Sequence, residues 1–533
     1  MTLSPSPVTA PSGDLAHEIA RRRTFAIISH PDAGKTTLTE KLLLYAGAID
    51  LAGAVRSRAN QRHAASDWMA MEQDRGISIT ASALEMEYAG YRINLLDTPG
   101  HQDFSEDTYR TLMAVDSAVM VLDAANGIEP QTLKLFQVCK LRHIPILTFI
   151  NKMDRDGKEP LELLDEIESV LQIAPVPMNW PVGSGPWFQG VYDFERNEVL
   201  RFERTEHNET RAPISVTGLD DSGLAAVIGD AAWQELRDQA ELLDGAGNEF
   251  DPERFARGEV TPVFFGSALN NFGVEPFLEA LLKLAPPPDA RADGIDPLSD
   301  VFSGFVFKIQ ANMDMKHRDR IAFVRVCSGR FERDMVVNHA RLGKKVRLGR
   351  AYKLFARERQ PIDEAFPGDV IGVVNPGTFA LGDMLTTGGG LPSVEIPRFP
   401  SEHFAALVNT DIARYKQFQR GLSQLEEEGA VQIFNDPSGL RREPILGVVG
   451  ELQFDVVLSR LRDEYGVDAR IERAPYECAR WVESDEAKDR IPLLRGMLAC
   501  VDRNQKPVYL FSSKWELDYF HGQNPDVVLA EIQ

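Results

Sequence analysis

Residues 29–36 read SHPDAGKT and stand between an apolar run and a helical pattern. The phosphate-binding loop pattern is GxxxxGK[ST], which Gly34, Lys35 and Thr36 match, while Ser29 occupies the place of the first glycine. In such a loop, backbone N–H groups surround the phosphates, the lysine bonds the β and γ phosphates, and the hydroxyl binds Mg²⁺. The residues that we expect to contact a nucleotide here are Asp32, Ala33, Gly34, Lys35, Thr36 and Thr37.

Around this loop, short apolar runs alternate with helical patterns over residues 23–285. That alternation is typical of a parallel β-sheet covered by helices. Each expected strand ends at a polar or glycine-containing turn, and open α/β sheets bind their ligands at such ends. The strands are expected at 24–29, 91–96, 118–122, 146–150 and 262–265, and an amphipathic helix at 161–171.

A second motif, DTPGH, covers residues 97–101 and follows the strand expected at 91–96. Asp97 can hold Mg²⁺ through a water molecule, and Gly100 can donate its N–H to a γ-phosphate. His101 stands where it could position an attacking water, a task that glutamine performs in some GTPases. Taken alone, His101 would more often be a structural histidine.

A third motif, NKMD, covers residues 151–154 and closes the strand expected at 146–150. The carboxylate of Asp154 can accept hydrogen bonds from the N1–H and the N2 amine of guanine, a pair of donors that adenine lacks. We expect Lys152 to pack its stem over the base and Asn151 to belong to the same nucleotide site.

A fourth motif, SAL, follows the strand expected at 262–265, and its backbone can contact the guanine oxygen; its residues are Ser267, Ala268 and Leu269. Four motifs in this order, each at a strand end, predict a GTPase that uses GTP, GDP and Mg²⁺. Asp154 and Ser267 are 113 positions apart, more than one strand–helix unit needs. We therefore expect an inserted subdomain at about 172–258.

Two stretches rich in proline and glycine, at 285–297 and 388–400, divide the rest of the chain. Between them, short runs of Val, Phe and Ile separated by glycine turns predict an antiparallel β-barrel. The order of helical and strand patterns after the second stretch predicts a ferredoxin-like α+β domain. The predicted organisation is a multidomain chain with a disordered leader at 1–14, an α/β P-loop GTP-binding domain containing the insert at 15–285, the barrel at 298–387, the α+β domain at 401–485 and a segment of unassigned role at 486–533.

The composition, with 43% apolar and 26% charged residues among 533, is ordinary for a multidomain globular protein. The 4 cysteines form no CxxC pair, so we expect reduced thiols, as in cytoplasmic proteins. No apolar run reaches the roughly 18 residues that cross a bilayer, and the N-terminus lacks the pattern of a signal peptide. We therefore expect a cytoplasmic protein with no membrane partner.

The net charge of −22 argues against a nucleic-acid partner, but the charge is unevenly distributed. Residues 301–360 contain 15 Lys and Arg against 5 Asp and Glu, a local net charge of +10. One basic segment in an acidic chain is compatible with docking on a polyanion through one face. A solvated barrel surface would explain the same charges, and the sequence leaves both interpretations open.

The motifs resemble those of the translational GTPases, the family that contains elongation factors Tu and G. The shared features are HxDxGKTT at 30–37, RGISIT at 75–80, DTPGH, NKMD and the barrel that follows. The resemblance implies that Ser78 takes the place of a threonine that binds Mg²⁺ and the γ-phosphate in the GTP state. It also implies an apolar gate of Pro31 and Ile77 beside His101, and a monovalent cation near Asp32.

Within that family, roughly residues 15–485 most closely resemble the bacterial peptide chain release factor three family, the class II release factors. The resemblance rests on stretches such as SHPDAGKTTLTEKLLL, SDWMAMEQDRGISIT, DTPGHQDFSEDTYRTL, FKIQANMDMKHRDRIAF, LEEEGAVQIF and VGELQFDVV. It implies a ribosome-activated GTPase of translation termination, whose GTP form promotes dissociation of the codon-reading, class I release factors after peptide release. The implied partners are ribosomal RNA and ribosomal proteins rather than DNA, and we expect a monomer.

Three alternatives differ in what the sequence should contain. An elongation factor G-like or ribosomal protection factor would continue into two more domains, whereas about 50 residues follow residue 485. A nucleotide-dependent scaffold would bind GTP without useful turnover, and replacement of His101 would then leave ribosome-stimulated hydrolysis unchanged. A metabolic P-loop kinase is disfavoured by NKMD and by the absence of a second substrate site.

Overall fold

The computed structural model covers most of the chain. The residues that it describes are 15–48, 71–72, 78–201, 214–219, 222–246, 249–289, 294–312, 319–355, 358–389, 391, 394, 396, 399–439, 441, 443–483 and 496–531. The leader predicted at 1–14 and Ile77 of the predicted gate lie outside the described residues.

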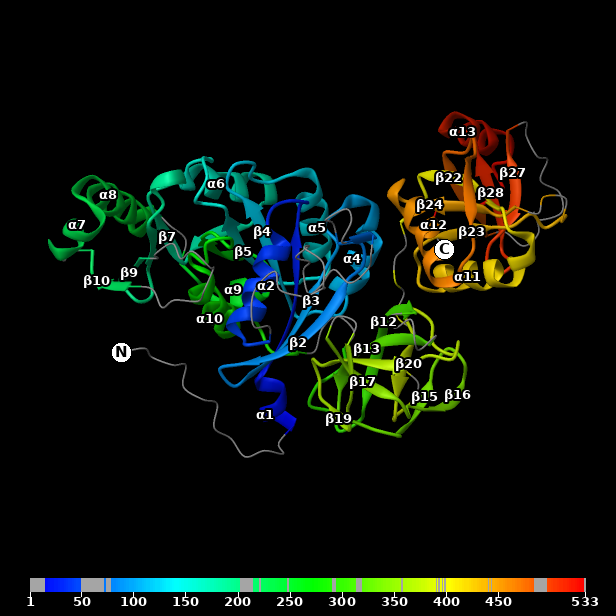
Figure 1. Ribbon diagram of the computed structural model, residues 1–533, viewed down its shortest axis with the longest axis horizontal. Coiled ribbons are helices and arrows are strands. Elements are labelled where there is room, and N and C mark those ends of the chain that lie inside the picture. The colour runs from blue at the N-terminus through cyan, green and yellow to red at the C-terminus, as the bar shows by residue number, and fades with distance from the viewer. Residues whose placement is uncertain are drawn as a thin grey trace.

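The first unit is built on a mostly parallel sheet with strand order β2-β3-β1-β4-β5-β11-β6, in which β2 alone runs antiparallel to its neighbour. The strands are β1 (Arg22–Ser29), β2 (Ser82–Tyr88), β3 (Tyr91–Asp97), β4 (Ser117–Asp123), β5 (Ile146–Asn151), β6 (Ala174–Pro177) and β11 (Val260–Phe265). The helices of this unit are α1 (Leu15–Ala20), α2 (Lys35–Tyr45), α4 (Ser105–Leu112), α5 (Pro130–Leu141), α6 (Pro160–Glu166) and α10 (Val274–Leu284). Helices cover the sheet (Figure 1), which explains why its strands are continuous apolar runs.

The parallel strands bring the predicted motifs to one edge of this sheet. β1 ends before the phosphate loop, β3 ends at Asp97 and β5 ends at Asn151. β11 ends at Phe265, just before the SAL motif. Because the carboxyl ends of parallel strands meet at the same edge, motifs that are far apart in the sequence become neighbours.

An antiparallel sheet of order β10-β9-β8-β7 with its helices forms the insert, at the end of the first unit away from the barrel (Figure 1). Its elements are β7 (Asn179–Val182), β8 (Gly190–Asp193), β9 (Glu198–Arg201), β10 (Ile214–Thr217), α7 (Ser222–Ile228) and α8 (Asp230–Ala246), followed by α9 (Pro252–Ala256). Trp180 of β7 is fully buried and packs against Phe265 of β11 with ring centroids 5.3 Å apart. This aromatic contact fixes the insert on the main sheet.

The second unit is an antiparallel β structure around its own apolar core. Its strands are β12 (Ser303–Ala311), β13 (Arg320–Ser328), β14 (Phe331–Glu332), β15 (Val336–His339), β16 (Lys344–Arg347), β17 (Ala351–Phe355), β18 (Glu358–Pro361), β19 (Glu364–Ala365), β20 (Val370–Val374) and β21 (Met384–Thr386). The residue pair Phe355 opposite Leu84 links this sheet to β2 of the first unit.

The third unit follows the order β22-α11-β23-β24-α12-β25, and its sheet has the strand order β23-β24-β22-β25. The elements are β22 (His403–Asn409), α11 (Tyr415–Glu427), β23 (Gln432–Phe434), β24 (Ile445–Val448), α12 (Leu452–Tyr465) and β25 (Ala469–Arg473). This is the ferredoxin-like arrangement. The predicted fold class, an α/β GTPase domain with an insert, an antiparallel barrel and an α+β domain, is thus confirmed.

A further antiparallel sheet, of order β27-β28-β26-β29, contains residues from both sides of position 485. Its elements are β26 (Cys478–Val482), β27 (Leu498–Val501), β28 (Pro507–Phe511) and β29 (Leu529–Ala530), with α13 (Lys514–Gln523). Phe404 of β22 packs against Phe434 and Tyr476, and Phe434 in turn contacts Trp481 of β26. Cys500 of β27 and Leu510 of β28 belong to the same buried cluster as Phe404 and Phe434, so the C-terminal segment packs on the third unit.

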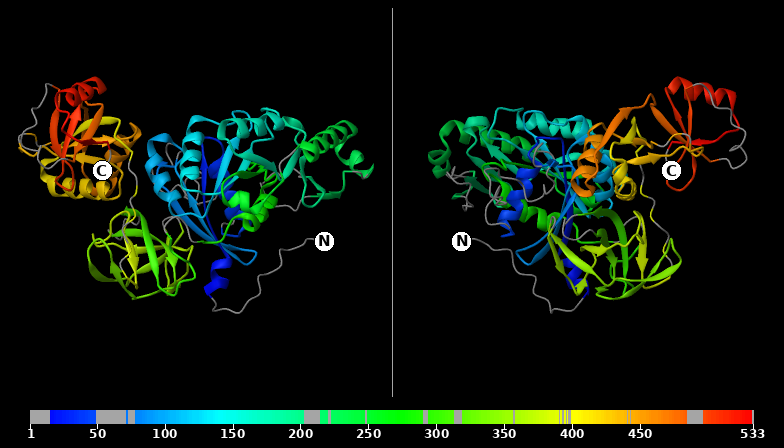
Figure 2. Two further views of the ribbon diagram at one scale, coloured as in Figure 1. Left: turned by 180° about the vertical axis from the view of Figure 1, so that it is seen from behind. Right: turned by 45° about the vertical axis from the view of Figure 1, so that its right-hand side comes forward.

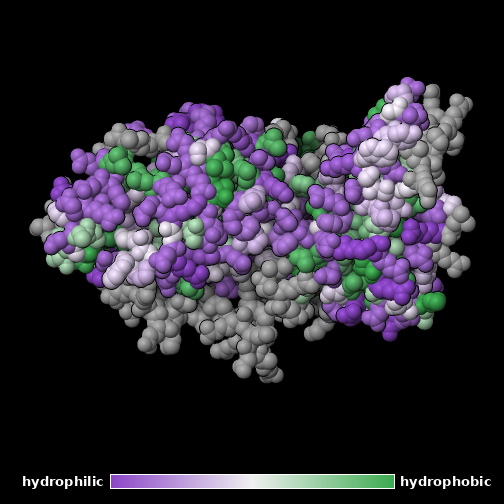
Figure 3. All heavy atoms as spheres, turned by 90° about the horizontal axis from the view of Figure 1, so that it is seen from above, coloured by the Kyte–Doolittle hydropathy of each residue, from purple (hydrophilic) through white to green (hydrophobic). Residues whose placement is uncertain are grey.

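The barrel and the third unit both lie beside the part of the first unit that carries α4, as the views of Figures 1 and 2 agree. The face shown in Figure 3 is mostly hydrophilic, with hydrophobic residues in small separate groups. Within the described ranges, no helix combines the length and apolar character that a bilayer crossing requires.

Candidate functional site

The predicted phosphate loop joins buried strand β1 to helix α2, which begins at Lys35. Gly34 has φ 98° and Asp32 has φ 64°, so the loop turns through the left-handed region twice. A Cβ atom at Gly34 would come within 2.1 Å of Asn151 Nδ2, so this close approach requires glycine. As the N-cap, Gly34 has no side chain to occupy the first N–H groups of α2, which leaves them suited to phosphate oxygens.

Lys35 and Asp97 form a buried ion pair at the edge of the sheet. Lys35 Nζ lies 2.6 Å from Asp97 Oδ1, and the two side chains are 6% and 2% exposed. Thr39 Oγ1 donates to the same carboxylate oxygen at 3.4 Å, and the hydroxyl of Thr36 stands one turn earlier on α2. The ammonium and hydroxyls at the start of α2, together with the carboxylate at the end of β3, fit the requirements of a nucleotide phosphate with Mg²⁺, which prefers oxygen ligands.

Asn151 joins the phosphate loop to the SAL motif. Its Nδ2 donates to the carbonyl of Ala33 at 2.8 Å, and its Oδ1 accepts from the N–H of Ala268 at 2.8 Å. Ser267 and Ala268 are fully buried, whereas Leu269 is half exposed. One side chain therefore holds two of the predicted nucleotide loops at a fixed separation.

Lys152 and Asp154 follow on the same strand end. Lys152 Nζ donates to the carbonyl of Asp32 at 2.5 Å and to Asp123 Oδ2 at 2.7 Å. Asp154 Oδ2 accepts from Asn270 Nδ2 at 2.9 Å, which orients the carboxylate from the side of the SAL loop. The structure thus brings the phosphate loop, NKMD and SAL together.

His101 begins the short helix η1 (Gln102–Phe104) that leads into α4. Its side chain is 29% exposed, and Nδ1 lies 3.1 Å from Asp103 Oδ1. The His101 ring is tilted against Phe104, with centroids 6.1 Å apart. Phe104 packs in a small apolar cluster with Ile79 and with Val456 of α12, so the third unit reaches the segment that carries His101.

The remaining predicted residues flank this segment. Gly100 lies against Pro31. A Cβ atom added at Gly100 would be 3.6 Å from Pro31 Cα. Ser78 is buried and directly precedes a backbone stretch held by Glu72, whose Oε1 accepts from the N–H groups of Ile79 and Thr80 at 2.9 and 3.0 Å.

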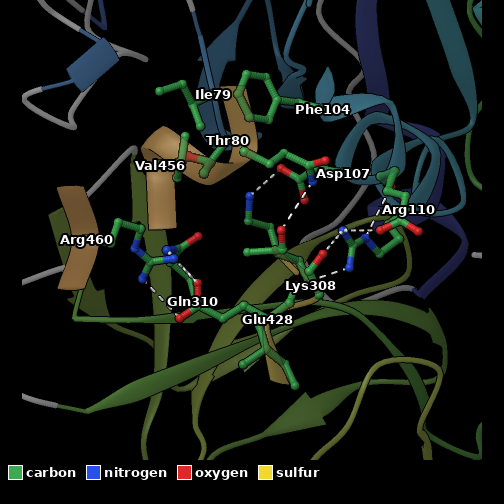
Figure 4. Close-up of a pocket in the computed structure, with 15 residues that line it drawn as sticks. Ile79, Thr80, Phe104, Asp107, Arg110, Lys308, Gln310, Glu428, Val456 and Arg460 are labelled. Carbon is green, nitrogen blue, oxygen red and sulfur yellow. Dashed lines mark hydrogen bonds and ion pairs between the residues drawn. The ribbon is translucent and has the colours of Figure 1, made fainter. Parts of the chain in front are cut away.

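A small pocket lies where all three units meet, rather than at the nucleotide loops (Figure 4). On one wall, Asp107 of α4 accepts from Lys308 Nζ of β12 and from the N–H of Ala81, at 2.8 and 2.6 Å. Burial alone would raise the pKa of Asp107, but the positive charges of Lys308 and Arg110 outweigh it and place the pKa below its ordinary value. Asp107 is therefore an ionised link between α4 and the barrel.

On the other wall, Arg110 of α4 reaches the third unit. Its guanidinium donates to the carbonyls of Glu428 and Gly429 at 3.1 Å each. The Glu428 side chain accepts from Arg460 on α12 at 2.6 Å and from the N–H of Ala311 on the barrel at 2.9 Å. Burial raises the pKa of Glu428, with Arg460 opposing that shift. A buried polar network thus joins α4, the barrel and the third unit.

The sequence does not reveal this junction, the polar network through which Asp107 and Arg110 join α4 to the other two units, although both residues stand within the stretch DTPGHQDFSEDTYRTL. Their spacing places them on one face of a helix, which is the one signal that the sequence offers. Asp103, Asp123 and Asn270 were likewise missed as partners of His101, Lys152 and Asp154. Each pairs with a residue that only the fold or a local turn brings near.

Family models match the three parts of the chain separately. The model "Elongation factor Tu GTP binding domain" matches residues 20–287, and "Elongation factor G domain 2" matches residues 301–388. The model "Class II release factor RF3, C-terminal domain" matches residues 394–521, including part of the segment after 485.

Proteins named Peptide chain release factor 3 are similar to this chain over nearly its whole length. That of Gloeobacter violaceus is 55% identical, covering 97% of this chain and 98% of its own. That of Synechocystis sp. is 54% identical, covering 100% of this chain and 99% of its own. A crystal structure of a Thermus thermophilus protein has a TM-score of 0.70 and 22% identity, covers 92% of this chain and 72% of its own, and shows the fold alone. The chain therefore belongs to the peptide chain release factor 3 family and is a GTPase of translation termination.

Proposed function

We propose that the GTP form of this protein binds the ribosome after peptide release and promotes dissociation of the class I release factor. GTP hydrolysis then lets the protein leave. The observation that carries the proposal is the attachment of α4 to both other units through Asp107 and Arg110. Only the short helix η1 separates α4 from the DTPGH motif. A change at the phosphate site that moves α4 must also move the barrel or the third unit, because their contacts are buried and polar.

In this proposal, Lys35 holds the phosphates and His101 positions the attacking water. Thr36, Ser78 and, through water, Asp97 would hold Mg²⁺, which neutralises phosphate charge when bound. Asp154 would accept hydrogen bonds from the guanine, and Asn151, Lys152 and the SAL backbone would surround the base. The residues assigned to nucleotide binding are Asp32, Ala33, Gly34, Lys35, Thr36, Thr37, Gly100, Asn151, Lys152, Asp154, Ser267, Ala268 and Leu269. A monovalent cation near Asp32 belongs to the same proposal.

We also propose that the barrel faces ribosomal RNA. Fewer of its basic side chains are available to contact RNA than the sequence suggested. Several basic residues of 301–360 pair inside the molecule, among them Lys308 with Asp107, Arg325 with Asp116 and Arg320 with Glu427. Lys344 and Lys345 of edge strand β16 are exposed, and neither has an ion-pair partner among the described residues. As neighbours on one exposed strand, these two lysines can meet phosphate groups.

The proposal keeps the predicted boundaries of the GTP-binding domain at 15–285, the barrel at 298–387 and the α+β domain at 401–485. It adds that residues 496–531, described in the C-terminal segment, act together with the third unit. It also includes a monomer that acts on cytoplasmic ribosomes. A single chain already brings the three units into contact, so the proposed mechanism needs no second copy.

The test is the dissociation rate of a fluorescently labelled class I release factor from ribosomes that have released their peptide. We expect this protein with GTP to accelerate dissociation, and the protein with GDP to leave the spontaneous rate unchanged. Lys35→Ala with GTP is the matched control and should behave like the GDP sample. If GTP gives no acceleration while ribosome-stimulated hydrolysis is intact, the proposed task is wrong and the protein serves another ribosomal step.

A further inference from the structure

Nδ1 of His101 faces two groups of Asp103 at once. The backbone N–H of Asp103 lies 3.2 Å from Nδ1, and the carboxylate oxygen Oδ1 lies 3.1 Å from it. These contacts exclude each other, because a nitrogen that accepts from the N–H has no proton, whereas one that donates to the carboxylate must have one. With the proton on Nδ1, the neutral ring has its lone pair on Nε2; otherwise Nε2 carries the proton.

The other oxygen of Asp103 is held by the third unit. Oδ2 accepts from the N–H of Leu452, the first residue of α12, at 2.8 Å. The Asp103 side chain is 9% exposed, and the positive end of the α12 dipole stabilises its charge. A Cβ atom at Gly450 would come within 2.0 Å of Asp103 Cγ, so the third unit also encloses the carboxylate sterically.

We propose that Asp103 is a positioning residue for His101 and that the third unit keeps it in place. Asp103 Oδ1 accepts the Nδ1–H of His101, so that Nε2 presents a lone pair to the attacking water. Leu452 and Gly450 fix the carboxylate from the opposite side. The third unit thereby becomes part of the GTPase site, although it contributes no atom to the water or the nucleotide. This inference rests on the proposed role of His101.

The first test is Asp103→Asn in the full-length protein, measured as single-turnover GTP hydrolysis on ribosomes. The amide oxygen can still accept from Leu452, but the amide nitrogen then donates to Nδ1 and leaves the proton on Nε2. We expect hydrolysis at least about 100-fold slower, within the range of a lost proton-accepting group. GTP affinity and the ribosome concentration for half-maximal rate should not change, since neither depends on the tautomer.

The second test separates positioning from structural support. If Asp103 acts through His101, the double variant His101→Ala/Asp103→Asn should hydrolyse GTP no more slowly than His101→Ala alone. Additive losses in the double variant would show that Asp103 acts elsewhere and would overturn the inference.

The third test reaches Asp103 from the third unit alone. Gly450→Ala pushes the carboxylate away without changing any residue of the nucleotide site, and we expect slower ribosome-stimulated hydrolysis with unchanged GTP affinity. The matched control is Gly522→Ala in α13, where an added Cβ meets nothing within 4 Å. Because Gly450→Ala leaves Asp103 itself intact, it keeps the inference testable even where Asp103→Asn does not fold.

These experiments distinguish the inference from the proposed function. Full GTPase activity of His101→Ala would overturn the proposed role of His101 and this inference with it, while the proposed dissociation of the class I factor would stand or fall by its own rate measurement. Suppose that His101→Ala hydrolyses GTP slowly on ribosomes while Asp103→Asn or Gly450→Ala hydrolyses it at the wild-type rate. That result would overturn only the positioning role of Asp103.

Discussion

Asn151 shows how one side chain can convert separate motifs into a site. Its two amide atoms bond Ala33 of the phosphate loop and Ala268 of the SAL loop, and Gly34 leaves the space that it fills. The loops are therefore held by a buried amide whose donor and acceptor are both satisfied, which stabilises a fixed geometry. The residue-scale predictions concern the charged groups that this frame positions.

Asp154→Asn should change the base preference of the nucleotide site. The carboxylate accepts from the guanine donors, whereas an amide nitrogen would donate to the carbonyl oxygen that xanthine carries at ring position 2. We expect GTP affinity to fall and xanthosine triphosphate affinity to rise, measured by competition with a fluorescent nucleotide. Retention of guanine selectivity would rule out Asp154 as the residue that reads the base.

Lys35→Ala should weaken GTP binding by about 100-fold or more, because a buried charge-assisted contact with the phosphates is lost. Equilibrium titration with a fluorescent GTP analogue measures the change. Lys134→Ala, which removes an exposed lysine of α5, is the control and should bind as the wild type does. Equal affinities in both variants would contradict the phosphate-loop assignment.

Much of the first unit could be predicted from the sequence, because its motifs are short and stand beside strands with recognisable apolar runs. The strand expected at 91–96 is β3 (Tyr91–Asp97), and the one at 146–150 is β5 (Ile146–Asn151). The junction could not be predicted, because Arg110 and Glu428 are 318 positions apart and neither lies in a pattern that names the other. The assigned chemical roles of the individual site residues stay predictions.

At the scale of elements, α4 is the connection between the nucleotide edge and the rest of the molecule. Asp107 on this helix is paired with Lys308 of β12, and Arg110 on the same helix binds the carbonyls at the end of α11. The Lys308, Asp107 and Arg110 side chains are 5%, 17% and 8% exposed, so solvent weakens these contacts less than it weakens exposed ion pairs. The helix therefore cannot move alone.

Arg110→Met should loosen the third unit from α4 while keeping an apolar stem of similar length. The carbonyls of Glu428 and Gly429 lose their donor, a loss worth about 1–3 kcal/mol for buried groups. We expect faster amide hydrogen exchange at the start of α12 and a lower unfolding free energy. Arg257→Met removes an exposed arginine and should change neither; equal exchange in both variants would show that Arg110 does not hold the junction.

The barrel should lose stability in mild acid through His339. Its side chain is fully buried, and burial lowers its pKa below the ordinary 6.5, with Asp383 opposing and Arg341 adding to the shift. The unfolded state therefore binds the proton first, so stability is full above about pH 6.5 and falls as the pH drops through the folded pKa. Urea unfolding of the wild type and of His339→Gln, at several pH values below about 6.5, measures how the free energy of unfolding depends on pH. An equal dependence on pH in both proteins would show that His339 is not the group responsible.

At the scale of the whole molecule, the described basic residues of 301–360 fall into two groups, one paired with acidic residues inside the molecule and one exposed to solvent. Lys308, Arg320 and Arg325 of the basic segment hold the barrel to acidic partners in the other units. Lys344 and Lys345 remain exposed on edge strand β16. An acidic molecule with a localised basic edge should approach a polyanion in a preferred orientation.

Lys344→Glu/Lys345→Glu should slow association with ribosomes and flatten its dependence on salt, because two contacts with phosphates are lost. Stopped-flow association rates at several salt concentrations measure both effects. The charge-matched control is Lys134→Glu/Lys140→Glu on α5, which should change the rates less. A larger effect in the control would place the RNA-facing surface on the first unit instead.

In the proposed function, GTP binding drives the class I release factor off the ribosome and hydrolysis only releases this protein. The decisive measurement records both departures in one reaction, with differently labelled class I factor and His101→Ala protein, in GTP. We predict that the class I factor leaves at the wild-type rate while the His101→Ala protein stays bound far longer than wild type. A class I factor that stays on the ribosome until GTP is hydrolysed would contradict the account.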